Sequence, residues 1–176
     1  MKLIAAYNSV NALGKENKLL YRLSDDLKHF KKTTKNHALV MGRKTFESLS
    51  GVLPGRLHLV ISRDFEYEHP NVRILHNRDE LDFQIKLLED EGLEVYVIGG
   101  GQLYEQYIDE CDTLYITEIA DTQPGDTYFP PFDKQAYREE FIEYFPAKDG
   151  NPAYTIYKYT RNASKYSTEN FIYNRV

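Results

Sequence analysis

The sequence predicts an α/β protein with a largely parallel sheet. Short runs such as LIAAY and HALVM are apolar at successive positions, as in strands that are covered on both faces. Amphipathic segments with helical spacing separate these runs through about residue 110. The last third of the chain instead has strand-like segments without helices between them, so we expect the sheet to finish with antiparallel edge strands.

Length and composition describe one ordinary domain. The chain has 176 residues, 41% hydrophobic and 28% charged, with a net charge of −5. This balance gives no general attraction for nucleic acid or an anionic membrane, so neither is expected as a partner. The single Cys111 excludes an internal disulfide, and the scattered histidines offer no metal-ligand spacing. The apolar start is too short for a signal peptide, and a cytoplasmic protein is expected.

The expected elements follow from periodicity and from turn residues. Strands are predicted over residues 3–7, 37–41, 57–62, 72–75, 95–98, 113–119, 139–145 and 154–160. Helices are predicted over residues 24–35, 43–49, 79–91 and 102–108. Residues 8–22 are expected to form one long loop, and loops of that length are often functional. Residues 1–161 are expected to form the domain, followed by a tail at 162–176 whose role the sequence does not indicate.

Asp26 is the candidate on which a ligand site depends. The apolar face of its predicted helix consists of Leu23, Leu27, Phe30 and Thr34, and Asp26 shares this face. The opposite face is expected to carry Asp25, Lys28, His29 and Lys32. A carboxylate on the buried side of a helix is costly unless a ligand or a side chain pairs with it, and burial raises its pKa. The alternative is that Asp26 only satisfies the free amides at the helix start.

Three successive glycines follow the strand predicted over residues 95–98. Gly99, Gly100 and Gly101 allow the backbone to approach a ligand closely, and the helix start behind them offers free amides to a phosphate. The pattern is not the G-x-G-x-x-G fingerprint, so it indicates a phosphate site of a different kind. The alternative is a tight turn that needs a flexible backbone.

Basic residues follow three other predicted strands. Arg43 and Lys44 come after Gly42, Arg63 follows the third strand, and His76 follows the fourth. The carboxyl ends of parallel strands meet at one edge of a sheet, where ligands bind. Each residue alone would be interpreted as a solvated surface charge. Together they predict a phosphorylated ligand, and two phosphate sites on one sheet favour a dinucleotide, NADP rather than NAD.

Several short motifs occur in an order that resembles dihydrofolate reductase. They are IAA, LGKEN, DLKHFKK, VMGRKTFES, LPGR, YVIGGGQLYEQ and GDTYFP, and the resemblance covers residues 1 to about 161. It implies an eight-stranded, mainly parallel sheet with about four helices. It also implies a monomer that uses NADPH to reduce dihydrofolate to tetrahydrofolate, with hydride transfer to C6 and protonation at N5. Such an enzyme supports one-carbon metabolism and thymidylate synthesis, and methotrexate or trimethoprim would inhibit it.

The resemblance also implies roles for individual residues. Asp26 would anchor and polarise the pterin, with Tyr21 and Thr117 as further catalytic residues, and Arg56 would form a fork with the glutamate carboxylate of the substrate. The implied substrate-binding residues are Ile4, Ala5, Asp26, Leu27, Phe30, Lys31, Leu49, Leu53, Arg56, Ile98 and Thr117. The implied NADPH-binding residues are Ala6, Leu13, Gly14, Gly42, Arg43, Lys44, Thr45, Ser62, Arg63, His76, Ile98, Gly99, Gly100, Gly101, Gln102, Leu103 and Tyr104.

The segment before Asp26 departs from the family pattern. Family members usually have two prolines and a tryptophan there, where this chain has Leu20, Ser24 and Tyr21. The tryptophan orders a water near the pterin in the family, and a tyrosine hydrogen-bonds with a different reach. Losing the prolines removes two backbone restraints, so we expect a more mobile loop and an altered turnover rate. Gln102 occupies a position that is often basic, which weakens the extra-phosphate site.

Two other functions stay open from the sequence. One is a reductase of the same fold that acts on another heterocycle, such as a pyrimidine precursor of riboflavin. Asp26, Phe30 and Arg56 favour folate, because a ribityl-phosphate substrate needs no carboxylate fork at that place. The other is a catalytically weak folate- or nucleotide-binding protein, which the unusual loop keeps open. An assay with dihydrofolate and NADPH separates the reductases, and methotrexate binding without turnover would identify the binding protein.

Overall fold

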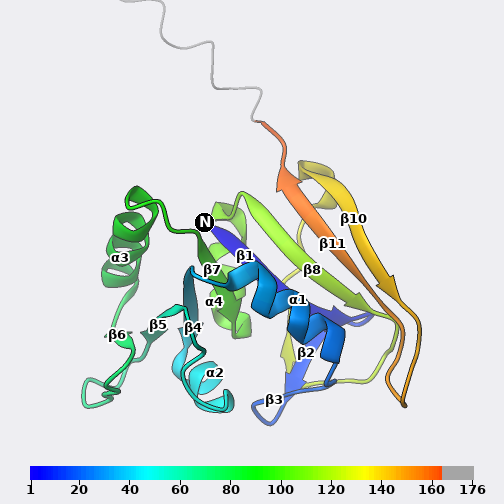
Figure 1. Ribbon diagram of the computed structural model, residues 1–176, viewed down its shortest axis with the longest axis horizontal. Helices are drawn as coiled ribbons and strands as arrows, with labels where there is room; N and C mark the ends of the chain where they lie inside the picture. The colour runs from blue at the N-terminus through cyan, green and yellow to red at the C-terminus, as the bar shows by residue number, and fades with distance from the viewer. Residues whose placement is uncertain (164–176) are drawn as a thin grey trace, which may run out of the picture.

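The computed structural model describes residues 1–163, which form an eight-stranded sheet with helices on both faces (Figure 1). In the order of the sheet, the strands are β10 (Tyr137–Phe145), β11 (Tyr154–Arg161), β8 (Thr113–Ile119), β1 (Lys2–Asn8), β7 (Val95–Gly99), β4 (Ala38–Gly42), β5 (Leu57–Ile61) and β6 (Arg73–Leu75). The helices are α1 (Ser24–Thr34), α2 (Arg43–Ser48), α3 (Arg78–Asp90) and α4 (Gly101–Tyr107). Short 3-10 turns span Ile108–Glu110 and Lys134–Ala136.

The strand directions confirm the predicted fold class. β1 runs parallel to β7 and β8, and β4 runs parallel to β7 and β5. β11 is antiparallel to both β8 and β10, which makes the antiparallel C-terminal edge. Predicted boundaries differ from the observed ones by a residue or two, as helix and strand ends usually do. Of the predicted tail at 162–176, residues 164–176 lie outside the described part of the chain.

Side chains alternate between the two faces of the sheet, and each face has its own helices. Leu3 and Ala5 of β1 belong to the hydrophobic cluster that includes residues of α3 and α4. Ile4 faces the other way, into a cluster with Phe46 of α2 and Phe30 of α1. Figure 1 shows α1 crossing in front of the sheet and α4 behind it. Over residues 1–163, no helix is both long and apolar enough to cross a membrane.

The prediction of one irregular loop over residues 8–22 is wrong. Two short strands lie there, β2 (Ala12–Lys15) and β3 (Lys18–Leu19), and they form a second sheet with β9 (Thr127–Tyr128). β2 pairs with β9 as well as with β3. The partner β9 is distant in the sequence, so the local pattern of residues 8–22 carries no sign of the pairing.

β10 is one of the two edge strands of the large sheet, and β6 is the other. It pairs with β11 on one side, and its pairing shifts register between Phe141 and Glu143. Phe141 is 61% exposed and Tyr144 is 56% exposed. Glu139, Glu140 and Glu143 lie on the same strand and are also exposed. The edge is therefore bulged and carries several carboxylates.

Gly125→Ala tests the close approach of the segment after β8 to β2. A Cβ at residue 125 would lie 2.4 Å from the carbonyl oxygen of Gly14, a backbone atom that cannot rotate away. We expect the substitution to lower the free energy of unfolding by about 1–3 kcal/mol, measured by urea denaturation. Gly42→Ala is the matched control, because a Cβ there meets no atom within 4 Å. Equal losses in the two variants would contradict the prediction.

Candidate active site

Asp26 lies in the first turn of α1, on the side that faces the sheet. Its Oδ1 accepts a hydrogen bond of 2.5 Å from Oγ1 of Thr117 on β8, and Thr117 is buried. Burial raises the pKa of Asp26, and the bond from Thr117 offsets only part of this rise. The carboxylate therefore reaches across to the sheet, which favours a site residue over the helix-start alternative.

His29 also faces the sheet, so the prediction that it points to the opposite side of α1 is wrong. Its Nε2 is buried and has no hydrogen-bond partner among the described residues. Its ring centroid lies 5.9 Å from that of Tyr115 on β8. Burial lowers the pKa of His29, and the charge of Lys32 lowers it further. Residues three apart on a helix share a face, which explains why His29 follows Asp26 inward.

A cluster of apolar side chains, named the Asp26 pocket below, lies on the α1 side of the sheet together with Asp26. Of the predicted substrate-binding residues, one hydrophobic cluster contains Ile4, Phe30, Leu49, Leu53 and Ile98. Three predicted residues lie differently. The side chain of Ala5 faces the α3–α4 core, Leu27 is 43% exposed on α1, and Lys31 is also exposed.

Arg56 lies beside Phe30, a member of this cluster. Its Nε donates to the carbonyl oxygen of Pro54 at 3.1 Å, and its Nη1 donates to Oγ1 of Thr34 at 3.4 Å. The guanidinium carbon lies 6.0 Å from the centroid of the Phe30 ring. These contacts hold the planar guanidinium beside Phe30, and a guanidinium fork is a group that can bind a carboxylate through two N–H donors.

A long cleft of about 1120 Å³ runs along the carboxyl ends of β4, β5, β6 and β7. It brings together every predicted NADPH-binding residue except Ala6. The side chain of Ala6 packs instead with the cluster of Leu23, Ile119 and Ile156 on the α1 face of the sheet. The predicted convergence of strand ends is therefore present in the structure.

Basic side chains form one rim of the cleft. Arg43, Lys44, Arg63 and His76 line it, as neighbouring β4, β5 and β6 require. Nη1 of Arg43 lies 3.0 Å from Oδ2 of Asp64, and its Nε lies 3.7 Å from Oε1 of Glu47. The guanidinium of Arg43 is thus oriented by two carboxylates before any anion arrives.

Glycines form the floor of the cleft. Gly99 has a φ of +124°, a conformation that favours glycine. A Cβ on Gly101 would lie 3.0 Å from Cγ2 of Thr127 and 3.2 Å from the carbonyl oxygen of Tyr128. Gly99, Gly100 and Gly101 line the cleft, and close packing against Thr127 and Tyr128 leaves little room for a side chain at residue 101.

Tyr104 connects the cleft to the Asp26 pocket. It lines the cleft and is 5% exposed. Its hydroxyl donates a hydrogen bond of 2.8 Å to the carbonyl oxygen of Ile4. The pKa of Tyr104 is raised chiefly by burial and further by the charge of Asp26. The two parts of the site are therefore contiguous.

The hydroxyl of Tyr21 makes contacts that sequence reasoning missed. It donates to Oδ2 of Asp121 at 2.6 Å and accepts from Nδ2 of Asn8 at 3.0 Å. Asp126 also ties the loops together, because its Oδ2 accepts from the backbone N–H of Glu16 at 2.8 Å. The motif GDTYFP was a signal for Asp126. Asn8 and Asp121 had no periodic or motif signal in the sequence.

The chain is similar to known dihydrofolate reductases in sequence and in structure. The family model described as "Dihydrofolate reductase" matches residues 1–161. The chain is 37% identical to a dihydrofolate reductase of Haemophilus influenzae over 85% of this chain and 90% of that protein. It is 39% identical to dihydrofolate reductase type 3 of Salmonella typhimurium over 86% and 91%.

A solved structure agrees with these sequence matches. It is a dihydrofolate reductase from Enterococcus faecalis, complexed with NADP(H) and RAB-propyl. It matches with a TM-score of 0.81 and 32% identity, over 92% of this chain and 95% of that one. Together with the cleft and the Asp26 pocket, these matches show that the chain belongs to the dihydrofolate reductase family.

Proposed function

We propose that the protein catalyses the NADPH-dependent reduction of 7,8-dihydrofolate to 5,6,7,8-tetrahydrofolate. The observation that carries the proposal is the position of Asp26. Its carboxylate is partly buried, bonded to Thr117, and adjacent to both an apolar pocket and a cleft with a basic rim. A buried carboxylate with few partners favours a ligand edge that presents N–H groups, as a pterin does.

The pocket residues fit the rest of the substrate. Phe30, Leu49 and Ile98 offer apolar surface to the pterin and benzoyl rings. Arg56 lies beside Phe30, where its fork of N–H groups matches the glutamate carboxylate. Antifolates that present an amidine-like edge to Asp26 would occupy the same pocket.

The cleft fits a dinucleotide with an additional phosphate. The floor at Gly99–Gly101 has no side chains and admits close approach of a pyrophosphate. Arg43, Lys44 and Arg63 supply positive charge on the rim. NADPH bound there would supply the hydride. The chain's own task is to hold the nicotinamide against the substrate ring, since orientation is its largest contribution to this kind of reaction.

Asp26 acts on the substrate by polarisation. As a carboxylate, it would accept hydrogen bonds from the pterin edge and make N5 more basic, while a water delivers the proton to N5. Thr117 fixes the direction of the carboxylate through the 2.5 Å bond. C6 then accepts the hydride.

Asp26→Asn should lower kcat/KM at neutral pH by about 100-fold or more, because the amide polarises the ring poorly. Activity should recover in part in acid, where the substrate arrives already protonated. The measurement is the oxidation of NADPH with dihydrofolate over a range of pH. Asp25→Asn is the matched control, since Asp25 is adjacent and pairs with Lys28 at 3.5 Å. Equal losses in both variants would contradict the role of Asp26.

The same variant should be more stable than the native protein at neutral pH. Burial raises the pKa of Asp26 above its ordinary value of 3.8. Folding therefore favours the protonated carboxyl, and this stability is present below pH 3.8 and is lost as the pH rises through the raised pKa. Asparagine avoids the charge, so we expect a higher Tm at pH 7 by calorimetry. A lower Tm would contradict the direction of this pKa shift.

Arg56→Lys should weaken dihydrofolate binding by about tenfold to 100-fold, because lysine keeps the charge but loses the fork. Binding of dihydropteroate, which lacks the glutamate, should change little, and so should binding of NADPH. Titration of the three ligands provides the measurement. Equal weakening of dihydrofolate and dihydropteroate would show that Arg56 acts on the pocket rather than on the carboxylate.

Arg63→Gln should raise the Kd of NADPH by about tenfold and leave that of NADH nearly unchanged, because only NADPH carries the additional phosphate. Arg73→Gln is the control, since Arg73 lies on the adjacent β6 and donates to Gln84 at 2.9 Å. The comparison needs both coenzymes at one ionic strength. A native protein that used NADH as well as NADPH would contradict the phosphate argument.

A further inference from the structure

We propose that Asp121 and Asn8 are positioning residues for the reduction, and that they act through the hydroxyl of Tyr21. They tether Tyr21, near the end of the segment 12–22, to the ends of β1 and β8. Earlier residues of the same segment line the cleft. This inference rests on the proposed function. It adds that these two residues restrain the segment that forms one wall of the cleft.

Both partners of the hydroxyl are themselves fixed. Asn8 ends β1 and is 2% exposed. Its Nδ2 donates to Tyr21 at 3.0 Å and to the carbonyl oxygen of Gln123 at 2.7 Å. Its Oδ1 accepts from the backbone N–H groups of Val10 at 3.2 Å and Ala12 at 3.0 Å. Every polar atom of this amide is used, so it cannot turn away from Tyr21 without losing bonds.

Asp121 is held by its backbone. Its carbonyl oxygen accepts from the N–H of Ser9 at 2.9 Å, and its own N–H donates to Ile119 at 2.9 Å. Its Oδ2 accepts from Tyr21 at 2.6 Å. Hydrogen bonding from Tyr21 is the largest influence that lowers the pKa of Asp121. An ionised acceptor makes this bond stronger than a neutral one.

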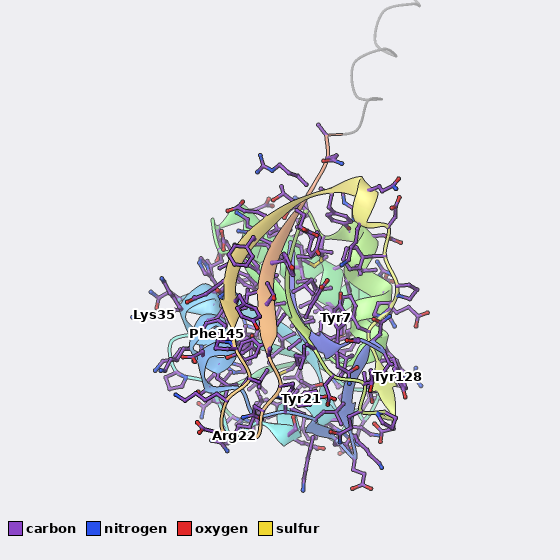
Figure 2. All side chains as sticks on the ribbon, turned by 90° about the vertical axis from the view of Figure 1, so that its right-hand side faces the viewer. Tyr7, Tyr21, Arg22, Lys35, Tyr128 and Phe145 are labelled. Atoms are coloured by element: carbon purple, nitrogen blue, oxygen red, sulfur yellow. The ribbon has the colours of Figure 1, made fainter. Side chains whose placement is uncertain are left out.

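The tether acts on the end of the segment, beyond the strands of the small sheet. β2 is fixed by β9 and by Asp126. Residues 20–23 lie beyond β3 and lead into α1. There the side chain of Tyr21 packs beside Leu23 and Ile119, and Nδ2 of Asn151 donates to the carbonyl oxygen of Arg22 at 3.3 Å. Figure 2 labels Tyr21 near Arg22, at the end of the sheet where β10 turns into β11.

This segment is also a wall of the cleft. Leu13, Gly14, Lys15, Asn17, Lys18 and Leu19 line it opposite the glycine floor. A hydrogen-bonded Tyr21 therefore restrains a wall of the coenzyme site at its C-terminal end. The bond offers a restraint in a segment where Leu20 and Ser24 leave the backbone without prolines.

The test compares Tyr21→Phe, Asp121→Ala, Asp121→Asn and the double variant of Tyr21→Phe with Asp121→Ala. Tyr128→Phe is the matched control, since it removes a hydroxyl that donates to Gly125 at 2.8 Å in the same small sheet. For each protein, the dissociation rate of NADPH, the single-turnover rate of hydride transfer, the Kd of dihydrofolate and the Tm are measured.

We expect Tyr21→Phe and Asp121→Ala each to speed NADPH dissociation and slow hydride transfer by about threefold to tenfold, the range of one hydrogen bond. The double variant should match Tyr21→Phe to within about twofold, because Tyr21→Phe already removes the bond to Asp121. Asp121→Asn keeps an oxygen acceptor and should lie closer to the native protein. The Kd of dihydrofolate and the kinetics of Tyr128→Phe should stay near native values.

Two results would overturn the tether. One is multiplication of the effects in the double variant. The other is that Tyr21→Phe and Asp121→Ala lower the Tm but leave NADPH dissociation and hydride transfer as they are in Tyr128→Phe. The bonds would then contribute to stability only. A native protein that binds NADPH but does not oxidise it with dihydrofolate would overturn the proposed function itself. If the native protein turns over and the variants keep the kinetics of Tyr128→Phe, whatever their Tm, the tether alone is overturned.

Discussion

The bond between Thr117 and Asp26 is the interaction on which the site depends. It joins α1 to β8 and fixes a carboxylate in surroundings that disfavour its charge. The helix is held in place by apolar packing at Leu23 and Phe30 and by its own local bonds, such as that from Thr34 to the carbonyl oxygen of Phe30 at 2.8 Å. A single neutral hydroxyl only partly offsets the cost of burying this carboxylate, and in the proposed function a ligand with N–H groups would offset more of it.

Much of the fold could be predicted because it rests on local patterns. Apolar runs such as Ala38–Met41 identified strands covered on both faces, and the positions of Gly42, Arg63 and His76 after successive strands identified one functional edge. Parallel strands place their carboxyl ends together, so motifs far apart in the sequence converge without any knowledge of distances. For this reason, the residues predicted at the ends of β4, β5, β6 and β7 line one cleft.

The remaining features depend on contacts that no local pattern contains. β2 pairs with β9, which is separated from it by more than half of the chain. Tyr21 donates a hydrogen bond to Asp121, and these residues lie in two irregular segments that are far apart in the sequence. The predicted helix face of His29 is wrong for a different reason. An apolar face was assigned from hydrophobic residues, but the arc that meets the sheet also includes a polar imidazole beside Tyr115. The periodicity of apolar residues does not predict which polar side chains lie between a helix and the sheet.

Carboxylates lie beside the basic side chains at the rim of the cleft, where an anion would bind to this acidic protein. Arg43 is bonded to Asp64 and lies near Glu47, with the ring of Tyr67 5.3 Å from its guanidinium carbon. These neighbours fix the direction of the guanidinium and limit the rotamer freedom that an incoming phosphate would otherwise have to remove. They also compete with that phosphate, so selectivity at this rim reflects a balance between orientation and neutralisation.

The bulged edge at β10 bears on how copies of the protein meet in solution. An open edge is a template for pairing with another chain, and aromatic residues such as Phe141 would favour such pairing. Glu139, Glu140 and Glu143 would face the same carboxylates of an approaching copy, and the register shift after Phe141 interrupts the row of backbone donors and acceptors. Repulsion and irregular spacing would thus disfavour edge-to-edge pairing of two copies at this strand.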